Sequence, residues 1–241
     1  YSQVKSGDFP ALVERAEGAD FASGTFGEDR ETVQLKDYGV KVSFSSQMIV
    51  NDDMSVITRL TSETGAATAD LENQLAYAAL TTNKTMNDTI ALYHASHGNL
   101  GTAGAITASS VAEAYKLMRM QTSTDGLRKL NLQPTILVCG PDKEAEALQF
   151  FAPVNATQTS GVNIYSGRMQ VVVDAEITGN QYYFISPRID GIVCYRLEGQ
   201  EAPSIESQIN FANNNLELKV AHAFAAAPMD WRAIVKNNGE A

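Results

Sequence analysis

Three patterns in the sequence predict an α+β fold. Apolar and small residues recur in steps of three and four from Met54 to about Thr82, which is the spacing of a long helix. A continuous apolar run over 135–139 leads directly into Gly140-Pro141, as when a buried strand is followed by a helix. Apolar residues also alternate with polar ones over 33–44 and 216–221, which is typical of strands. Helices and strands therefore share the chain, and no internal repeat is present.

The first 53 residues are acidic and extended. They hold 5 basic and 10 acidic side chains, which accounts for half of the formal net charge of −10. The alternating pattern changes phase at Gly39, so we expect a bulge or bend there. Together with residues 13–31, it predicts a long hairpin whose tip lies near Gly24 to Asp29. Such a hairpin has little core of its own and is marginal alone.

Residues 54 to about 82 are predicted to form the long helix. Asn51, Asp52 and Asp53 are suitable caps, and their acidic groups lie at the positive end of the helix dipole. The helix would be roughly 40 Å long at 1.5 Å per residue. Gly65 costs about 1 kcal/mol relative to Ala and marks the place where a kink would occur.

The middle of the chain alternates between helices and strands. Ser110 and Glu113 have the spacing of a capping box at the start of one helix. The strand over 135–139 and a helix that ends before Pro153 follow it. Further strands are expected over 169–174, 181–185 and 192–197, with Gly179-Asn180 as a tight turn between the first two. The last predicted strand covers 216–221.

Size and charge exclude several classes of protein. The chain has 241 residues and is 44% hydrophobic, so it can bury a sizeable core. Its 18 Lys and Arg against 28 Asp and Glu argue against a protein that mainly grips nucleic acid. No apolar run approaches the roughly 20 residues of a membrane helix. Two cysteines, Cys139 and Cys194, cannot form a disulfide framework.

The candidate chemical residues favour structural roles. His94 and His97 form an HxxH pair, but a zinc site needs further ligands that the spacing does not supply. Cys139 precedes a helix start, where a thiol can be activated, yet none of the three histidines is arranged as its base. Phosphate-loop, dinucleotide-turn, nucleophile-elbow and zinc-helix motifs are absent. The sequence therefore predicts no catalytic, cofactor-binding or metal-binding residues. It also predicts that the protein is not an enzyme.

Three motifs and their order resemble a known family. Residues 92–100 (LYHASHGNL) are similar to that family's connection of an aromatic residue, two histidines, Gly and Asn. Residues 136–141 (ILVCGP), followed by 144–148, look like its step from strand to helix. Residues 216–220 and Asp230-Trp231-Arg232 resemble the usual end of its chain. The sequence thus resembles the tailed-phage major capsid proteins of the Hong Kong 97-type fold, most closely the Mu-like major head subunits.

The resemblance implies self-assembly into hexamers and pentamers that form an icosahedral head around packaged DNA. It implies an N-terminal arm at 1–12, an extended loop at 13–45, a peripheral domain at 46–104 and 204–241 with a spine helix at about 54–82, and an axial domain at 105–203. Contacts with neighbouring subunits are expected at Phe21, Phe26, Arg15, Arg30 and Glu31.

The same resemblance implies the protein's surroundings. Portal, scaffold and maturation protease are expected partners during assembly in the bacterial host cytoplasm, and the product is the virion capsid. Packaged DNA would be enclosed without sequence-specific binding, and no cofactor and no membrane are involved. Tyr1 would then be either the first residue after a maturation cleavage site or a boundary set when the chain was expressed.

Two other interpretations remain open at this point. An encapsulin-like shell has the same fold and would carry enzyme cargo in place of DNA. A cytoplasmic cysteine hydrolase using Cys139 belongs to a different class. Particle mass separates a shell from the hydrolase.

Overall fold

The computed structural model describes residues 2–5, 29–45, 47, 55–124, 126–152 and 163–240. These residues form two compact units. Unit 1 comprises the described residues of Val33–Ala79 and Val193–Ala227. Unit 2 comprises those of Ser2–Thr32, Leu80–Ile192 and Pro228–Ala241.

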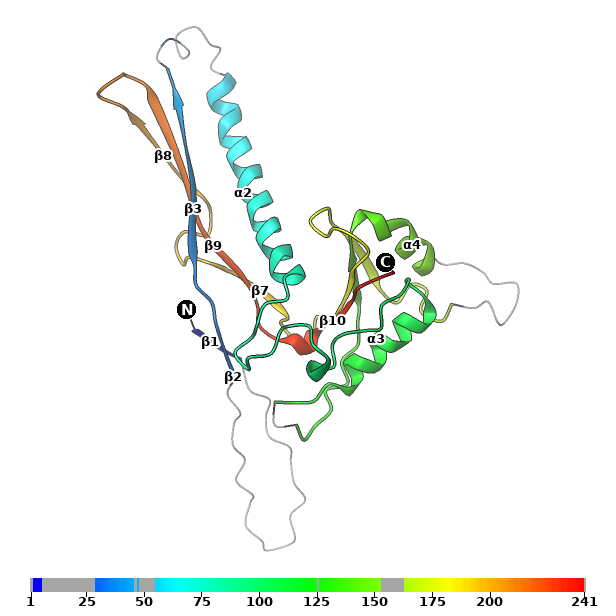
Figure 1. Cartoon of the computed structure of the whole chain (residues 1–241). Coiled ribbons are helices and arrows are strands. Elements are labelled where there is room, and N and C mark those ends of the chain that lie inside the picture. The colour runs from blue at the N-terminus through cyan, green and yellow to red at the C-terminus, as the bar shows by residue number, and fades with distance from the viewer. Residues whose placement is uncertain are drawn as a thin grey trace, which may run out of the picture. The chain divides into compact units, whose positions relative to one another are not determined.

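The predicted long helix is α2, Ser55–Thr81, in unit 1 (Figure 1). Its 27 residues correspond to about 40 Å. The helix continues through Gly65, so the cost of this glycine does not break it. Thr64, Leu71 and Leu75 are half-buried on one face, as their spacing predicts.

Unit 1 also holds a sheet with the strand order β3-β9-β7, in which β8 pairs with β9. The strands are β3 (Lys36–Phe44), β7 (Ile192–Arg196), β8 (Ser204–Ile209) and β9 (Leu216–Pro228). The predicted bulge at Gly39 is wrong, because β3 pairs with β9 in unbroken register from Lys36↔Phe224 to Phe44↔Leu216. Gly39 instead allows the backbones of β3 and β9 to lie close together, since a Cβ there would lie 2.9 Å from the carbonyl oxygen of Val220.

Unit 2 is built on a second four-stranded sheet with the order β10-β6-β4-β5. Its strands are β4 (Ile136–Cys139), β5 (Gln170–Val173), β6 (Tyr182–Ile185) and β10 (Ile234–Asn237). Strand β4 is parallel to β5 and antiparallel to β6. The strands predicted at 169–174 and 181–185 are thus present but are not a hairpin, because β4 lies between them. Gly179 still makes a turn, with φ 78°.

Unit 2 also contains two helices. They are α3 (Ala108–Met120) and α4 (Pro141–Phe151), and α4 begins with proline as predicted. The cap of α3 differs from the prediction: Thr107 is the N-cap, and Ser110 is the third helical residue of the capping box. Glu113 instead accepts hydrogen bonds from the backbone nitrogen and hydroxyl of Thr102. The core of the unit includes the fully buried Met118, Leu137, Tyr182 and Phe184.

A short antiparallel pair stands at the beginning of the chain. Strand β1 (Ser2–Lys5) pairs with β2 (Asp29–Thr32), from Ser2↔Thr32 to Lys5↔Asp29. Arg15, Phe21, Phe26 and the rest of residues 6–28 lie outside the described residues. Asp29, which the sequence predicted at the tip of the hairpin, is instead paired with Lys5, and residues 36–44 pair with β9.

The compact units divide the chain at different residues from the domains that the resemblance implies. Residues 80–104 and 228–240 belong to the unit that contains α3 and α4, while 193–203 belong to the unit that contains α2. The predicted domains refer to positions in a shell, and they stay predictions.

Gly140 gives a test of the packing in unit 2. A Cβ at Gly140 would lie 2.1 Å from the backbone carbonyl oxygen of Ile177, which cannot move without displacing the chain. We expect Gly140→Ala to lower the free energy of unfolding by about 1–3 kcal/mol through this overlap. Gly104→Ala is the matched control, because a Cβ at Gly104 meets nothing within 4 Å. Urea unfolding checks both variants, and equal stabilities would contradict the prediction.

Candidate functional site

The His-x-x-His-Gly-Asn segment forms a turn held by its own polar side chains. His94 caps the short 3-10 helix η1 (Ala95–His97), and its Nδ1 accepts a hydrogen bond from the Ser96 backbone at 3.1 Å. Gly98 follows with φ 61°, a conformation that favours glycine. The amide oxygen of Asn99 accepts from the His94 backbone nitrogen at 3.1 Å. The residue types of the motif are therefore explained by the shape of this turn.

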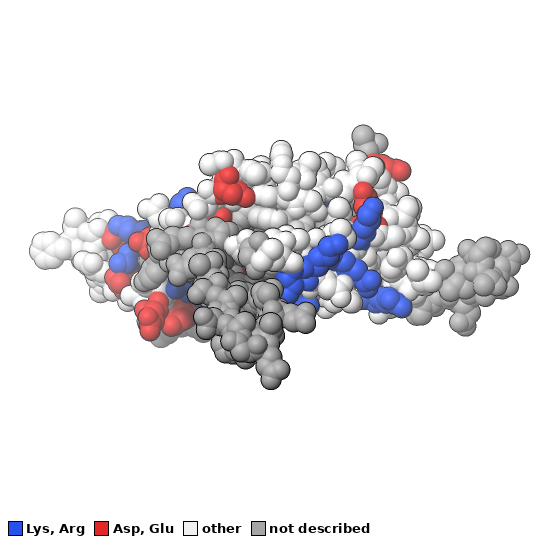
Figure 2. All heavy atoms as spheres, turned by 90° about the horizontal axis from the view of Figure 1, so that it is seen from below, with Lys and Arg blue, Asp and Glu red and all other residues white. Residues whose placement is uncertain are grey.

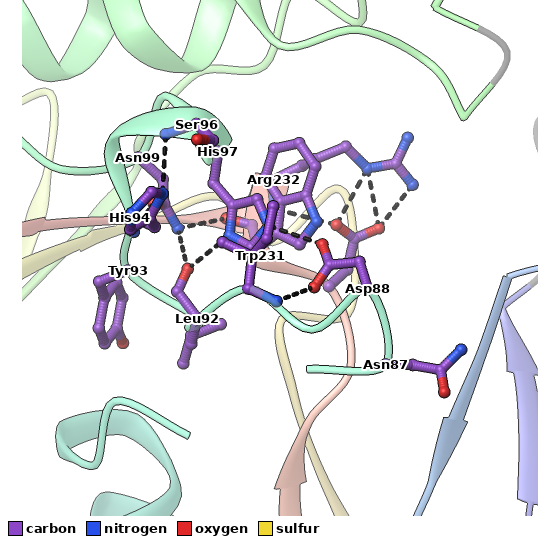
Figure 3. Close-up of polar contacts among 12 residues, drawn as sticks. Asn87, Asp88, Leu92, Tyr93, His94, Ser96, His97, Asn99, Trp231 and Arg232 are labelled. Carbon is purple, nitrogen blue, oxygen red and sulfur yellow. Dashed lines mark hydrogen bonds and ion pairs between the residues drawn. The ribbon is translucent and has the colours of Figure 1, made fainter. Parts of the chain in front are cut away.

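His97 links that turn to the end of the chain (Figure 3). Its Nδ1 lies 3.1 Å from the Leu92 carbonyl oxygen, and its Nε2 lies 2.7 Å from the Asp88 carboxylate. The imidazole also stacks on the indole of Trp231, with ring centroids 4.4 Å apart and planes 1° from parallel. Both ring nitrogens and one ring face are thus engaged, which gives His97 a structural role in place of metal binding.

Asp230 and Arg232 form a buried ion pair beside this stack. Arg232 donates to Asp230 through Nε at 2.9 and 3.0 Å and through Nη2 at 2.6 Å. Asp230 also caps the 3-10 helix η3 (Trp231–Ala233) by accepting from the Arg232 backbone nitrogen. The guanidinium reaches the carbonyl oxygen of Thr122 at 3.2 Å.

Asn99 completes the connection between these segments. It is fully buried, and its amide nitrogen donates to the carbonyl oxygens of Leu92 at 2.7 Å and Trp231 at 3.3 Å. One polar cluster, here called the Trp231 cluster, therefore joins three segments that are far apart in the sequence: residues 88–99, 121–123 and 230–232. The cluster holds these segments of unit 2 together.

Cys139, the sequence candidate for a nucleophile, lies buried at the end of β4. Burial raises the pKa of its thiol to about 11, with a further contribution from Glu144 and Glu146. Such a thiol is protonated at neutral pH, when only the thiolate is a good nucleophile. Within the described part of the chain, no three His, Cys, Asp or Glu side chains form a group that could hold a metal ion.

A second polar cluster, not predicted from the sequence, connects α2 with the sheet of unit 1. Glu72 on α2 accepts from Arg196 Nε at 2.8 Å, and its Oε1 lies 2.8 Å from Nε2 of the buried His222. The hydrogen bond from Arg196 holds the pKa of Glu72 below its ordinary value, assisted by His222 and opposed by partial burial. Arg196 also lies over the ring of Phe224, 5.7 Å from its centroid. These contacts join the long helix to β7 and β9.

The predicted contact residues are only partly within the described chain. Arg30 lies on β2. Glu31 is buried, and its carboxylate accepts a hydrogen bond from the Asn87 backbone nitrogen at 3.0 Å. Sequence reasoning missed other apolar side chains that are strongly exposed, among them Leu127 at 79% and Phe211 at 101%. Single exposed apolar side chains are common on folded chains, and only a contiguous patch of them marks a surface that meets a partner.

None of the described helices is both long and apolar enough to cross a membrane.

Solved structures share this fold over the whole chain. The capsid of a native GTA particle matches with a TM-score of 0.67 and 13% identity, covering 100% of this chain and 85% of that chain. A structure from Mycobacterium phage Patience matches with a TM-score of 0.65 and 11% identity, covering 100% and 79%. One from Mycobacterium phage Bobi has a TM-score of 0.63 and 10% identity, covering 100% and 85%. These likenesses confirm the predicted Hong Kong 97-type fold.

No curated protein matches the chain. The model of the phage capsid protein family matches residues 29–237. That range contains the Trp231 cluster, the long helix and both sheets. This chain therefore belongs to the phage capsid protein family.

Proposed function

We propose that this chain is the major capsid protein of a phage head, which copies of it build as hexamers and pentamers in an icosahedral shell around packaged DNA. The observation that carries the proposal is the family match over residues 29–237. The whole-chain likeness to structures titled as capsids, including the mature capsid of bacteriophage PhiM1, supports it. The chain then resides in the virion after assembly in the host cytoplasm.

The extended loop and arm make the contacts between neighbouring subunits in this proposal. The β1–β2 pairing supports this role, because it brings Lys5 and Asp29 together and so joins the two ends of the segment between them. The loop would carry Arg15, Phe21 and Phe26, with Arg30 and Glu31 at its base. Residues 46–104 and 204–241 would form the peripheral domain, and 105–203 the axial domain.

The proposed role is structural rather than enzymatic. The raised pKa of Cys139 and the engagement of both His97 nitrogens support this view. Portal, scaffold and a maturation protease are the proposed assembly partners. Packaged DNA is enclosed without sequence-specific binding, in keeping with a formal charge of −10, which repels phosphates.

Assembly of the purified chain tests the proposal. We expect sedimentation velocity to show particles far larger than the 26.0 kDa chain, and negative-stain microscopy to show closed shells or capsomers. A 26.0 kDa species at every protein concentration, with or without a scaffold protein from the same phage, would overturn the proposal. Particles that protect enzyme cargo in the producing cell, with no nuclease-resistant DNA, would favour the encapsulin-like alternative.

A further inference from the structure

The strand order of unit 2 determines which loops meet at each end of its sheet. At one end, Cys139 of β4 lies beside Val173 of β5 and Tyr182 of β6, and Tyr182 lies beside Asn237 of β10. The residues that follow β4, β5 and β10, and those that precede β6, therefore gather at this end. The opposite end gathers the residues that precede β4, β5 and β10 and follow β6.

The first of these ends is acidic. Five carboxylates lie there, and together they are called the acidic end: Asp142, Glu144, Asp174, Glu176 and Glu240. Backbone contacts hold the segments together, since Asp174 donates to the Cys139 carbonyl at 3.1 Å and the Asn180 side chain donates to the Glu240 carbonyl. Among the described cations near these carboxylates, Lys143 is buried and paired with Glu146 at 2.7 Å, whereas the exposed Lys116 lines the same pocket as Glu240. One exposed cation offsets only part of the charge of five carboxylates.

The opposite end is basic. Five exposed cations lie there, and together they are called the basic end: Arg119, Arg128, Lys129, Arg168 and Arg188. The bridge Thr122↔Lys129 places the loop after α3 beside the last turn of that helix. Arg188 donates to the Leu130 carbonyl at 3.1 Å, and Arg119 lies 5.7 Å from the ring centroid of Tyr115.

Among the described residues, few acidic side chains lie at this basic end. Asp190 is exposed there, whereas Asp88 contacts His97 and Asp230 pairs with Arg232. Figure 2 views unit 2 from the side of α3 and shows Lys and Arg side chains gathered on that face. The charge of unit 2 is therefore divided between the two ends of its sheet.

The two ends cannot neutralise each other within one copy. Strand β4 separates them by four residues, or about 13 Å. This exceeds the Debye length of about 8 Å at physiological ionic strength, so exposed charges at the two ends are largely screened from each other. Two different copies, however, can bring opposite ends into direct contact. A contact between unlike surfaces of identical subunits closes into a ring when the rotation allows it.

We propose that unit 2 of one copy meets unit 2 of the neighbouring copy head to tail, with the basic end of one copy against the acidic end of the next. This inference rests on the proposed shell function and specifies the contact within its capsomers. Exposed apolar side chains at the basic end fit a protein partner better than DNA: Leu127, at 79% exposure, precedes Arg128, and Ile164, at 63%, lies four residues before Arg168. A protein contact buries such side chains at its centre and keeps charges at its rim.

Charge reversal at each end tests this contact. The variant Arg128→Glu/Lys129→Glu reverses two of the five charges of the basic end, so that carboxylates there face the carboxylates of the acidic end. The variant Asp142→Lys/Glu144→Lys reverses two of the five charges of the acidic end, so that lysines there face the cations of the basic end. We expect each variant alone to lose assembled particles through repulsion of like charges. Carrying all four substitutions in one chain should restore them, because opposite charges again face each other. Mixing the two single-end variants should restore six-membered rings in which they alternate, but not five-membered rings, in which strict alternation is impossible.

Controls separate failure of this inference from failure of the proposed function. Lys84→Glu/Lys219→Glu makes the same change in net charge as Arg128→Glu/Lys129→Glu, at exposed lysines that belong to neither end and lie outside the extended loop, and it should leave particles intact. Far-ultraviolet circular dichroism and Trp231 fluorescence establish that each variant folds. If the unaltered chain does not assemble, the proposed function fails.

If the unaltered chain assembles, three results would overturn the head-to-tail contact. The first is normal assembly of both single-end variants. The second is loss of assembly that neither the four-substitution chain nor the mixture restores. The third is intact particles that retain less DNA in Arg128→Glu/Lys129→Glu, which would assign the basic end to phosphate binding instead.

Discussion

Replacing Asp230 with alanine is expected to lower the free energy of unfolding of unit 2 by about 3–5 kcal/mol. The side chains of Arg232 and Asp230 are only 9% and 6% exposed, so the variant removes the carboxylate that accepts three hydrogen bonds from the buried guanidinium. The variant also removes the acceptor that caps η3 at the Arg232 backbone nitrogen. Few other single substitutions in the Trp231 cluster remove a charge partner and a cap together.

Trp231 is well placed to report this loss. It is the single tryptophan of the sequence, and it stacks on His97 within the same cluster. Urea unfolding followed by its fluorescence therefore measures the stability of unit 2.

A double variant separates the contribution of the ion pair from that of the helix cap. Asp230→Asn/Arg232→Met keeps a capping acceptor and removes both charges, so it should recover most of the stability that Asp230→Ala loses. A loss below about 1 kcal/mol for Asp230→Ala would show that the pair is as weak as an exposed salt bridge.

The two halves of the Trp231 cluster were recognisable in the sequence, but their contact was not. The motif around His94 and His97 and the motif around Trp231 were each singled out for resemblance to a family. Local spacing explains the turn at His94, since its partner Ser96 is two residues away. The bond from Asn99 to Trp231 spans 132 residues, and no periodicity in the sequence indicates such a pairing.

Strong periodic signals predicted their elements correctly, and weak ones failed for identifiable reasons. The helix α2 and strand β4 carry clear apolar patterns, and both were found. The second half of β9 reads Ala-Phe-Ala-Ala-Ala, in which alanine has a low preference for strands, so its length was underestimated. Strand β8 has mostly exposed side chains and was missed.

In two places, contacts with residues far away in the sequence made a local turn or cap pattern misleading. Gly179-Asn180 suggested that the flanking strands pair, and the turn itself is real. However, β4 forms bonds with both strands and lies between them. The choice of N-cap for α3 failed in a similar way, because Glu113 finds a partner in Thr102 outside the helix. Sheet order likewise determines the division of charge in unit 2, because it sets which loops meet at each end of the sheet.

Phe184→Ala is the other substitution with a large expected effect, about 3–5 kcal/mol. Phe184 is 1% exposed at the centre of the unit 2 sheet, where β6 pairs with β4 on one side and β10 on the other. Truncation there removes an edge-to-face contact with Tyr182, whose ring centroid lies 5.6 Å away, and leaves a cavity between strands that hydrogen bonds hold in place.

The matched control for Phe184→Ala is Leu148→Ala, at an exposed apolar side chain on α4, which we expect to change stability by no more than about 0.5 kcal/mol. Urea unfolding followed by Trp231 fluorescence measures both variants in the same unit. Because β6 joins the strands on which the acidic and basic ends are arranged, Phe184→Ala should also reduce assembly into particles. A stable Phe184→Ala protein that assembles normally would show that the packing of this sheet does not position the surfaces between subunits.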